Sequence, residues 1–300
     1  YFNSVRGLSL LMSDPLLHGS MPAVFGPPAK PLDWIDSAAD DEAASNHDDA
    51  GSGCGFPEER LEFNGIGISV VQGCGSVVGT GCVVSAGVND LVAHVASRCE
   101  SLLGRRVLEL GSGVGAVGIA MAAMGASVVL TDVPQNPRPE LRASAETVRS
   151  SGLFGNLLSV LEHNVGRNAE AIAARGGSAE VLELRWGDRG QLRRAREAGP
   201  FDLVLACNAT YDTGAYGALA ESLGALCGGG TRVFLGNTSN LGDMALLVAT
   251  AEAAGLRCAG RTEEGETVVL ELRLAAPSCG ARGAEGDGGP QETPRTAGPA

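Results

Sequence analysis

Hydrophobic and polar positions along residues 61–275 follow two different periods. Short apolar runs bounded by glycine or polar residues predict strands, and apolar residues spaced three and four apart predict helices. The predicted strands cover residues 65–72, 75–84, 105–110, 126–132, 179–184, 201–207, 231–236, 256–260 and 266–274. The predicted helices cover residues 88–103, 114–124, 156–174, 216–226 and 244–254.

The order of these elements predicts an α/β fold. From residue 105 onward strands and helices alternate, and this order gives a mostly parallel sheet with helices on both faces. Residues 201–207 are almost continuously apolar, which is typical of a strand buried on both faces. The last two predicted strands are joined by a short turn and should pair antiparallel, and the first two should form an N-terminal hairpin.

The two ends of the chain lack these periods. Residues 1–60 hold clusters of Pro, Gly, Ser and Asp with few regularly spaced apolar positions, so we predict an acidic, disordered N-terminal region. Residues 276–300 have the same character and predict a disordered tail. One folded domain is expected over residues 61–275.

Composition and charge narrow the classes of partner. The chain has 300 residues, 44% of them hydrophobic, and a net charge of −13, with acids concentrated in residues 33–62 and no evident basic face, so nucleic acid is a poor partner. No apolar run reaches the ~20 residues of a membrane helix. The eight cysteines show no CxxC pair and no zinc spacing, so we expect no metal site and a reducing compartment, cytoplasmic or nuclear.

A glycine-rich turn carries the strongest local signal. Residues 107–115 read VLELGSGVG, a predicted strand that runs into glycines and then a helix. Backbone N–H groups and a helix N-terminus then lie at the carboxyl edge of the sheet, where α/β folds bind ligands. Gly111 and Gly113 let a ligand approach the main chain because they lack a Cβ. Asp132 ends the next predicted strand, about where an acid binds two ribose hydroxyls.

Two ligand classes fit this turn. The spacing Gly111-x-Gly113-x-x-Ala116 matches the dinucleotide pattern, so an NAD(P)-dependent oxidoreductase is one interpretation. Glu109 favours the other class, because its carboxylate suits a ligand with an ammonium group, such as S-adenosylmethionine, and would repel a pyrophosphate. A tight strand–helix turn without a ligand is the third interpretation.

Five segments together extend this pattern to a family. They are GTGCVVSAGVNDLVAHV at 79–95, VLELGSGVGAVGIAMAAMGASVVLTD at 107–132, NLLSVLEHNVGRN at 156–168, LELRWGD at 182–188 and FDLVLACNATYD at 201–212. Over about residues 79–275 the chain resembles the seven-strand, S-adenosylmethionine-dependent methyltransferases, and more narrowly the lysine methyltransferase group called methyltransferase family 16. The resemblance implies a Rossmann-like, seven-stranded, mostly parallel sheet with an antiparallel C-terminal strand pair.

The resemblance also assigns roles to individual residues. Gly111, Ser112 and Gly113 would pass under the methionine and ribose of S-adenosylmethionine, and Asp132 would bind the ribose hydroxyls. Trp186 would lie beside the adenine, and Cys207 would offer a backbone contact at the end of its strand. The proposed catalytic residues, at the mouth of the methyl-transfer site, are Asn208 and Tyr211.

Two departures from the family pattern concern this mouth. Ser85 stands where the family usually has a tryptophan that packs at the cofactor, and Asn208 replaces an acid. An amide can accept a hydrogen bond from a substrate amine but carries no charge. Residues 136–155 resemble an insertion, and Gly236–Asn240 lacks the basic residue often found there.

The expected reaction is in-line methyl transfer from the sulfonium to a side-chain nitrogen of a protein, most readily a neutral lysine. The protein then needs to align donor and acceptor and remove water. Ser85 and Asn208 keep a second interpretation open, an inactive cofactor- or partner-binding pseudoenzyme. The NAD(P)-dependent oxidoreductase explains the glycines and Asp132 but none of the downstream motifs.

Overall fold

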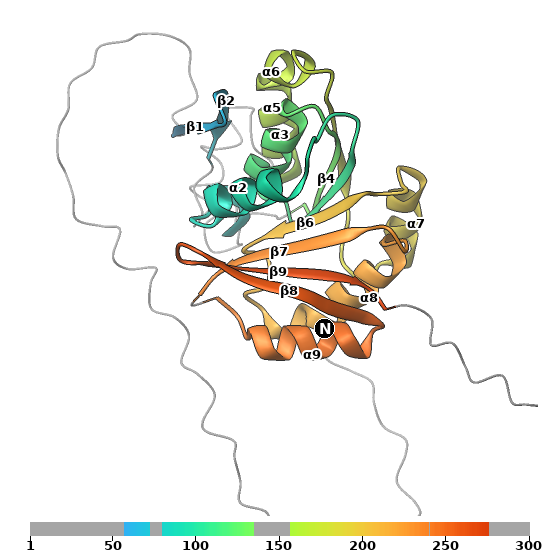
Figure 1. Cartoon of the computed structure of the whole chain (residues 1–300). Coiled ribbons are helices and arrows are strands. Elements are labelled where there is room, and N and C mark those ends of the chain that lie inside the picture. The colour runs from blue at the N-terminus through green and yellow to red at the C-terminus, as the bar shows by residue number, and fades with distance from the viewer. Residues whose placement is uncertain (1–56, 73–79, 135–156, 240, 276–300) are drawn as a thin grey trace, which may run out of the picture. The chain divides into compact units, whose positions relative to one another are not determined.

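The computed structural model describes residues 57–72, 80–134, 157–239 and 241–275, all of which fall within one compact unit (Figure 1). A seven-stranded sheet forms its centre, in the order β5-β4-β3-β6-β7-β9-β8. Strand β9 runs antiparallel to both neighbours, and the other strand pairs are parallel. The predicted fold is therefore confirmed. The strands are β3 (Arg106–Leu110), β4 (Ser127–Asp132), β5 (Ser178–Glu183), β6 (Leu203–Cys207), β7 (Arg232–Thr238), β8 (Leu256–Glu264) and β9 (Thr267–Leu274).

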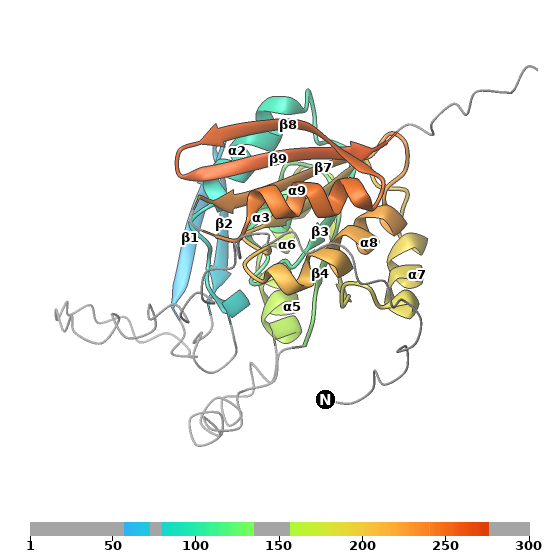
Figure 2. The ribbon, with the colours of Figure 1, turned by 90° about the horizontal axis from the view of Figure 1, so that it is seen from below.

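Helices cover both faces of the sheet, as Figures 1 and 2 show. One face packs against α2 (Val88–Arg98), α3 (Ala116–Ala123), α5 (Leu157–Arg167) and α6 (Ala169–Ala173). The other face packs against α7 (Arg189–Glu197), α8 (Tyr216–Leu226) and α9 (Met244–Ala253). Side chains of a strand alternate between faces, so Val107 joins the first cluster and Leu108 the second.

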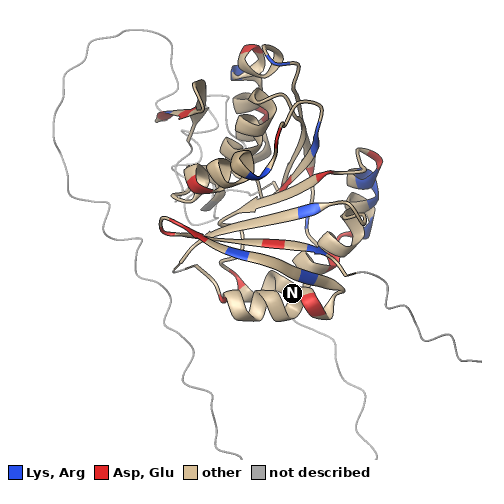
Figure 3. Ribbon diagram, in the orientation of Figure 1, with Lys and Arg blue, Asp and Glu red and all other residues tan. Residues whose placement is uncertain are grey.

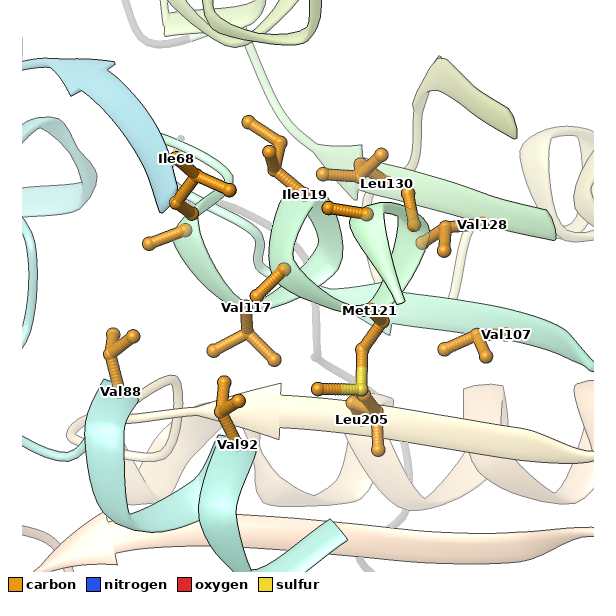
Figure 4. Close-up of a cluster of buried hydrophobic side chains, with 14 of the residues drawn as sticks. Ile68, Val88, Val92, Val107, Val117, Ile119, Met121, Val128, Leu130 and Leu205 are labelled. Carbon is orange, nitrogen blue, oxygen red and sulfur yellow. The ribbon is translucent and has the colours of Figure 1, made fainter. Parts of the chain in front are cut away.

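Helix α3 is buried on every side and fixes the centre of the first cluster. All eight of its residues are buried, and Figure 4 shows Met121 of this helix against Leu205 of β6. Such a helix needs small residues, because strands β3 and β4 and helix α2 all pack against it. The Ala- and Gly-rich sequence of α3 meets that need.

The N-terminal hairpin uses a different partner strand from the predicted one. Strand β1 (Glu58–Phe63) pairs antiparallel with β2 (Ile66–Val71). Asn64 and Gly65 form the turn with φ of 52° and 75°, the left-handed pair that a tight hairpin requires. The predicted strand 75–84 is wrong over residues 80–84, which contain the short 3₁₀ helix η1 (Thr80–Cys82); residues 73–79 lie outside the described part.

The exposed charged residues of β1 explain why residues 58–60 are included in the predicted disordered region. Its residues alternate between exposed and partly buried positions, and the outward ones are mostly charged. The strand begins at Glu58, three residues before the expected start of the domain at 61. The remaining predictions for residues 1–56, 136–155 and 276–300 lie outside the described residues.

Helix α7 was not predicted at all. Only Leu192 and Ala195 are buried in it, so no apolar period reveals it. Asp188 begins the helix by accepting hydrogen bonds from Gly190 N and Gln191 N, both 2.9 Å, which is a standard N-cap. Figure 3 shows arginines gathered on this helix. They are Arg189, Arg193, Arg194 and Arg196.

Two predicted helices end earlier than expected. The helix predicted over 156–174 is two helices, α5 and α6, which meet at Asn168. The helix predicted over 88–103 ends at Arg98. None of the helices in the described ranges is both long and apolar enough to cross a bilayer.

Candidate active site

The loop between β3 and α3 lies where the strand order of the sheet reverses. Strand β3 has β4 on one side and β6 on the other, and ligands of open α/β sheets bind at the carboxyl ends of strands at such a point. Gly111, Gly113 and Gly115 take φ of 69°, 56° and 88°. These left-handed angles favour glycine, so the sequence VLELGSGVG produces this loop directly.

Asp132 closes the loop from the end of β4. Its Oδ2 accepts a hydrogen bond from Gly113 N at 2.8 Å, and its Oδ1 accepts one from Val133 N at 2.7 Å. The predicted neighbourhood of Gly113 and Asp132 is therefore present. A carboxylate has about four acceptor positions, so each oxygen keeps capacity for a further donor. Burial raises the pKa of Asp132, although the hydrogen bonds from Gly113 and Val133 oppose that shift.

Ser112 ties the ends of β3 and β4 together. Its N donates to Thr131 O at 2.9 Å, and its Oγ accepts from Thr131 N at 3.0 Å. Thr131 Oγ1 in turn donates to Glu109 O at 2.7 Å. The three residues fix the loop relative to the neighbouring strand. Ser112 is itself buried.

The carboxyl group of Glu109 lies between β3 and α3. Glu109 is only 1% exposed, and its Oε2 accepts a hydrogen bond from Gly118 N at 3.0 Å. Burial raises the pKa of Glu109 to about 8. The carboxyl group thus binds the first turn of α3, whereas the sequence predicts that it faces a ligand ammonium.

Trp186 and Ala209 flank the first glycine of the loop. A Cβ placed on Gly111 would lie 3.5 Å from Trp186 Cζ2 and 3.1 Å from the Cβ of Ala209. Trp186 follows β5 and is partly buried against the second cluster. The structure therefore brings the predicted aromatic residue beside the predicted glycine, although 75 positions of sequence separate them.

The two departures from the family pattern contact each other. Asn208 Nδ2 donates to Ser85 Oγ at 2.9 Å, and Ser85 Oγ lies 3.5 Å from Cys207 Sγ. Asn208 Oδ1 accepts from Thr238 N at 2.8 Å. This network joins the segment before α2 to the ends of β6 and β7. Burial raises the pKa of the Cys207 thiol to about 12, so its sulfur stays protonated.

The loop after β6 contains one buried polar residue, Thr210, and one exposed aromatic residue, Tyr211. Thr210 is buried, and its Oγ1 donates to Asn237 Oδ1 at 2.6 Å. Tyr216 OH donates to Thr210 O at 2.9 Å. Tyr211, the predicted site-lining residue, is 54% exposed. It belongs to the same edge of the sheet as Asn208.

Two contacts of the glycine loop were missed by sequence reasoning. A Cβ on Gly113 would lie 2.6 Å from Gly81 O, so the segment that contains η1 passes directly over the loop. Asn164 of α5 donates from Nδ2 to Val114 O at 2.9 Å. The motifs at 79–95 and 156–168 contained both residues, but nothing in their spacing indicates contact with the loop.

An open groove lies at the same edge, beyond the end of β7. It has a volume of about 610 Å³, and Asp243, Glu263 and Glu266 are among the residues that line it, with Arg261 as the basic one. Ser239 N donates to Glu266 O at 2.9 Å, which connects the groove to the strand end that Asn208 contacts. Within the described ranges, no group of three or more His, Cys, Asp and Glu is placed to hold a metal ion.

Comparison with known proteins finds relatives of this chain by sequence. Residues 65–149 match a family model described as lysine methyltransferase. EEF1A lysine methyltransferase 3 is 26% identical in Xenopus tropicalis, over 59% of this chain and 66% of that protein, and 28% identical in Mus musculus, over 59% and 63%. Protein N-lysine methyltransferase METTL21A of Danio rerio is 34% identical over 45% of this chain and 50% of that protein.

The matched region spans between half and two thirds of the length of these relatives. The match to the family model begins in the hairpin and includes the glycine loop and Asp132. Of the five segments that carry the resemblance, the match includes the two at 79–95 and 107–132. The chain thus resembles the lysine methyltransferase family, as its motifs predict.

Proposed function

We propose that this protein is an S-adenosylmethionine-dependent methyltransferase that acts on lysine side chains of proteins. The observation that carries the proposal is the hydrogen bond of 2.8 Å between Gly113 N and Asp132 Oδ2, beside Trp186 at the switch point of the sheet. The hydrogen bond places a carboxylate against the bare main chain of Gly113, and Trp186 lies against Gly111 of the same loop. The names of the relatives support the lysine acceptor.

The residues present fit the cofactor by their chemistry. Asp132 keeps acceptor capacity for the two ribose hydroxyls, while Gly113 N holds its carboxylate in place. Gly111 leaves space between Trp186 and Ala209 that a Cβ would fill. Trp186 provides a flat apolar face for the adenine. When bound, S-adenosylmethionine supplies an electrophilic methyl group on its sulfonium.

The chain itself has to orient the acceptor nitrogen and exclude water. Asn208 Oδ1 already accepts from Thr238 N, so one lone pair remains for a substrate amine. The hydroxyl of Tyr211 offers a second polar contact at this edge. The acidic groove beyond β7 would attract a positively charged protein segment. The lysine must lose its proton before transfer, because only the neutral amine has a lone pair.

Ligand binding separates this function from the dinucleotide alternative. We expect S-adenosylmethionine and S-adenosylhomocysteine to raise the thermal unfolding temperature of the full chain, because both bind the folded state alone, while NAD and NADP leave it unchanged. A shift with NAD or NADP and none with the sulfur nucleosides would reject the proposal.

Methyl transfer separates an enzyme from an inactive cofactor-binding module. The full chain, incubated with a cell lysate and methyl-labelled S-adenosylmethionine, should label protein, and mass spectrometry should place the methyl groups on lysine. Heat-treated protein is the control. Cofactor binding without label in any lysate protein would favour the module that Ser85 and Asn208 left open.

A further inference from the structure

Helix α5 packs against the glycine loop. Leu157, Leu161 and Asn164 are three and four positions apart and share one face of the helix. A Cβ on Gly115 would lie 2.5 Å from Leu161 Cδ1, and one on Gly81 would lie 2.8 Å from Leu157 Cδ2. The loop and the segment above it both rest on this face.

Asn164 is the polar member of that face, and its amide makes three hydrogen bonds. Nδ2 donates to Val114 O at 2.9 Å and to Val71 O at 3.0 Å, while Oδ1 accepts from Val71 N at 2.8 Å. Asn164 is 0% exposed. One buried side chain therefore connects the edge of hairpin strand β2 with the loop between β3 and α3.

We infer that Asn164 is a positioning residue for the cofactor loop, and that it couples this loop to the N-terminal hairpin. The inference rests on the proposed function. Val114 directly follows Gly113, whose N–H holds Asp132. Val114 O lies two peptide groups after the one that carries Gly113 N, so the hydrogen bond from Asn164 holds the loop on the C-terminal side of Gly113. This contact narrows the conformations open to the loop, and a preorganised loop binds its ligand at a lower cost in ordering.

Asn168, one helical turn later, provides a matched comparison. It accepts from Ser69 N at 2.9 Å and donates to Ser69 O and Asn164 O, both at 2.7 Å. It thus holds the same strand β2 with the same chemistry. These three hydrogen bonds reach the hairpin and the helix, and none of them reaches the glycine loop.

The test compares Asn164→Ala with Asn168→Ala in the full chain. Both variants should lower the unfolding temperature, because each removes the hydrogen bonds that a buried asparagine makes to β2. Isothermal titration with S-adenosylhomocysteine, at a temperature where all proteins are folded, should show at least tenfold weaker binding for Asn164→Ala. Asn168→Ala should stay within about threefold of the wild type.

A second measurement on the wild type avoids variants that fail to fold. Hydrogen exchange should show that S-adenosylhomocysteine slows exchange at Val71 N, which Asn164 holds, more than at Ser69 N, which Asn168 holds. Equal losses of affinity in the two variants, or equal protection of the two amides, would overturn the inference. Absence of binding to the wild type would instead reject the proposed function.

Discussion

Asn208 combines an unusual backbone angle with two hydrogen bonds. Its φ is 48°, a left-handed value that asparagine tolerates better than most residues. Its amide carbonyl accepts from Thr238 N and its amide nitrogen donates to Ser85 Oγ. An asparagine paired with a serine thus forms a neutral, hydrogen-bonded connection at a position where the resembled family carries an acid.

We predict that Asn208→Ala destabilises the fold and that Asn208→Asp is tolerated. Alanine loses both hydrogen bonds and strains the left-handed angle, which should lower the free energy of unfolding by about 1–3 kcal/mol. Aspartate keeps an acceptor for Thr238 N, and the hydroxyl of Ser85 can rotate to donate to it. Urea unfolding measures both variants. Equal stability of Asn208→Ala and the wild type would show that the network has no structural role.

Glu109 should make the stability of the protein depend on pH. Its pKa is about 8 in the folded protein, against 4.5 for an ordinary glutamate. Between these values the folded state holds a proton that the unfolded state has lost, so raising the pH lowers the free energy of unfolding. The contribution is fully present below pH 4.5 and is lost as the pH rises through 8.

Glu109→Gln isolates this effect, because an amide oxygen still accepts from Gly118 N but does not titrate. We predict that the wild type loses roughly 1–3 kcal/mol more stability than Glu109→Gln between pH 5 and pH 8. Chemical unfolding at several pH values checks it. Parallel curves for the two proteins would mean that Glu109 is ionised in the folded state.

At the scale of elements, helix α3 leaves no space for added atoms. A Cβ on Gly118 would lie 2.6 Å from both Glu109 Oε2 and Leu130 Cδ2, whereas one on Gly166 of α5 meets nothing within 4 Å. Gly118→Ala should cost ~1–3 kcal/mol through overpacking. Gly166→Ala should instead stabilise by ~0.5–1 kcal/mol, because alanine is the better helix former. Thermal unfolding of both variants tests this; a stabilising Gly118→Ala would show that the layer between β3 and α3 is looser than described.

Elements with a strong local pattern could be predicted from the sequence, and polar elements could not. The unit from β3 to β4 combines apolar strands, a glycine turn and a terminal acid, so both the fold and the Gly113–Asp132 pair follow from it. Strand β1 and helix α7 bury few apolar residues. Their signals were the Asn64–Gly65 turn and the Asp188 cap, which the hydrophobic pattern does not contain.

Contacts of the loop with distant segments could not be predicted either. Asn164 and Val114 are 50 residues apart, and Gly81 meets Gly113 only because helix α5 and the segment around η1 pack on the same loop. Tertiary packing creates these contacts, and no spacing rule in a single sequence describes them.

At the scale of the whole described unit, the strand order assembles the candidate site. Strand β3 lies between β4 and β6, so the glycine loop, Asp132 and Asn208 reach the same edge of the sheet from distant parts of the sequence. The opposite edge is different in character. There Asp202 accepts from Arg106 N at 2.9 Å and from Arg105 at 3.2 Å, a contact that supports the strand starts.

Isothermal titration with S-adenosylhomocysteine tests whether Asp132 and the glycine loop bind the cofactor, with Asp132→Ala as the variant and Asp202→Ala as the matched control at the opposite edge. We expect the wild type to bind, Asp132→Ala to bind at least tenfold more weakly, a loss of about 1.4 kcal/mol or more, and Asp202→Ala to keep the wild-type affinity. Wild-type affinity in Asp132→Ala, or no binding to the wild type, would contradict it.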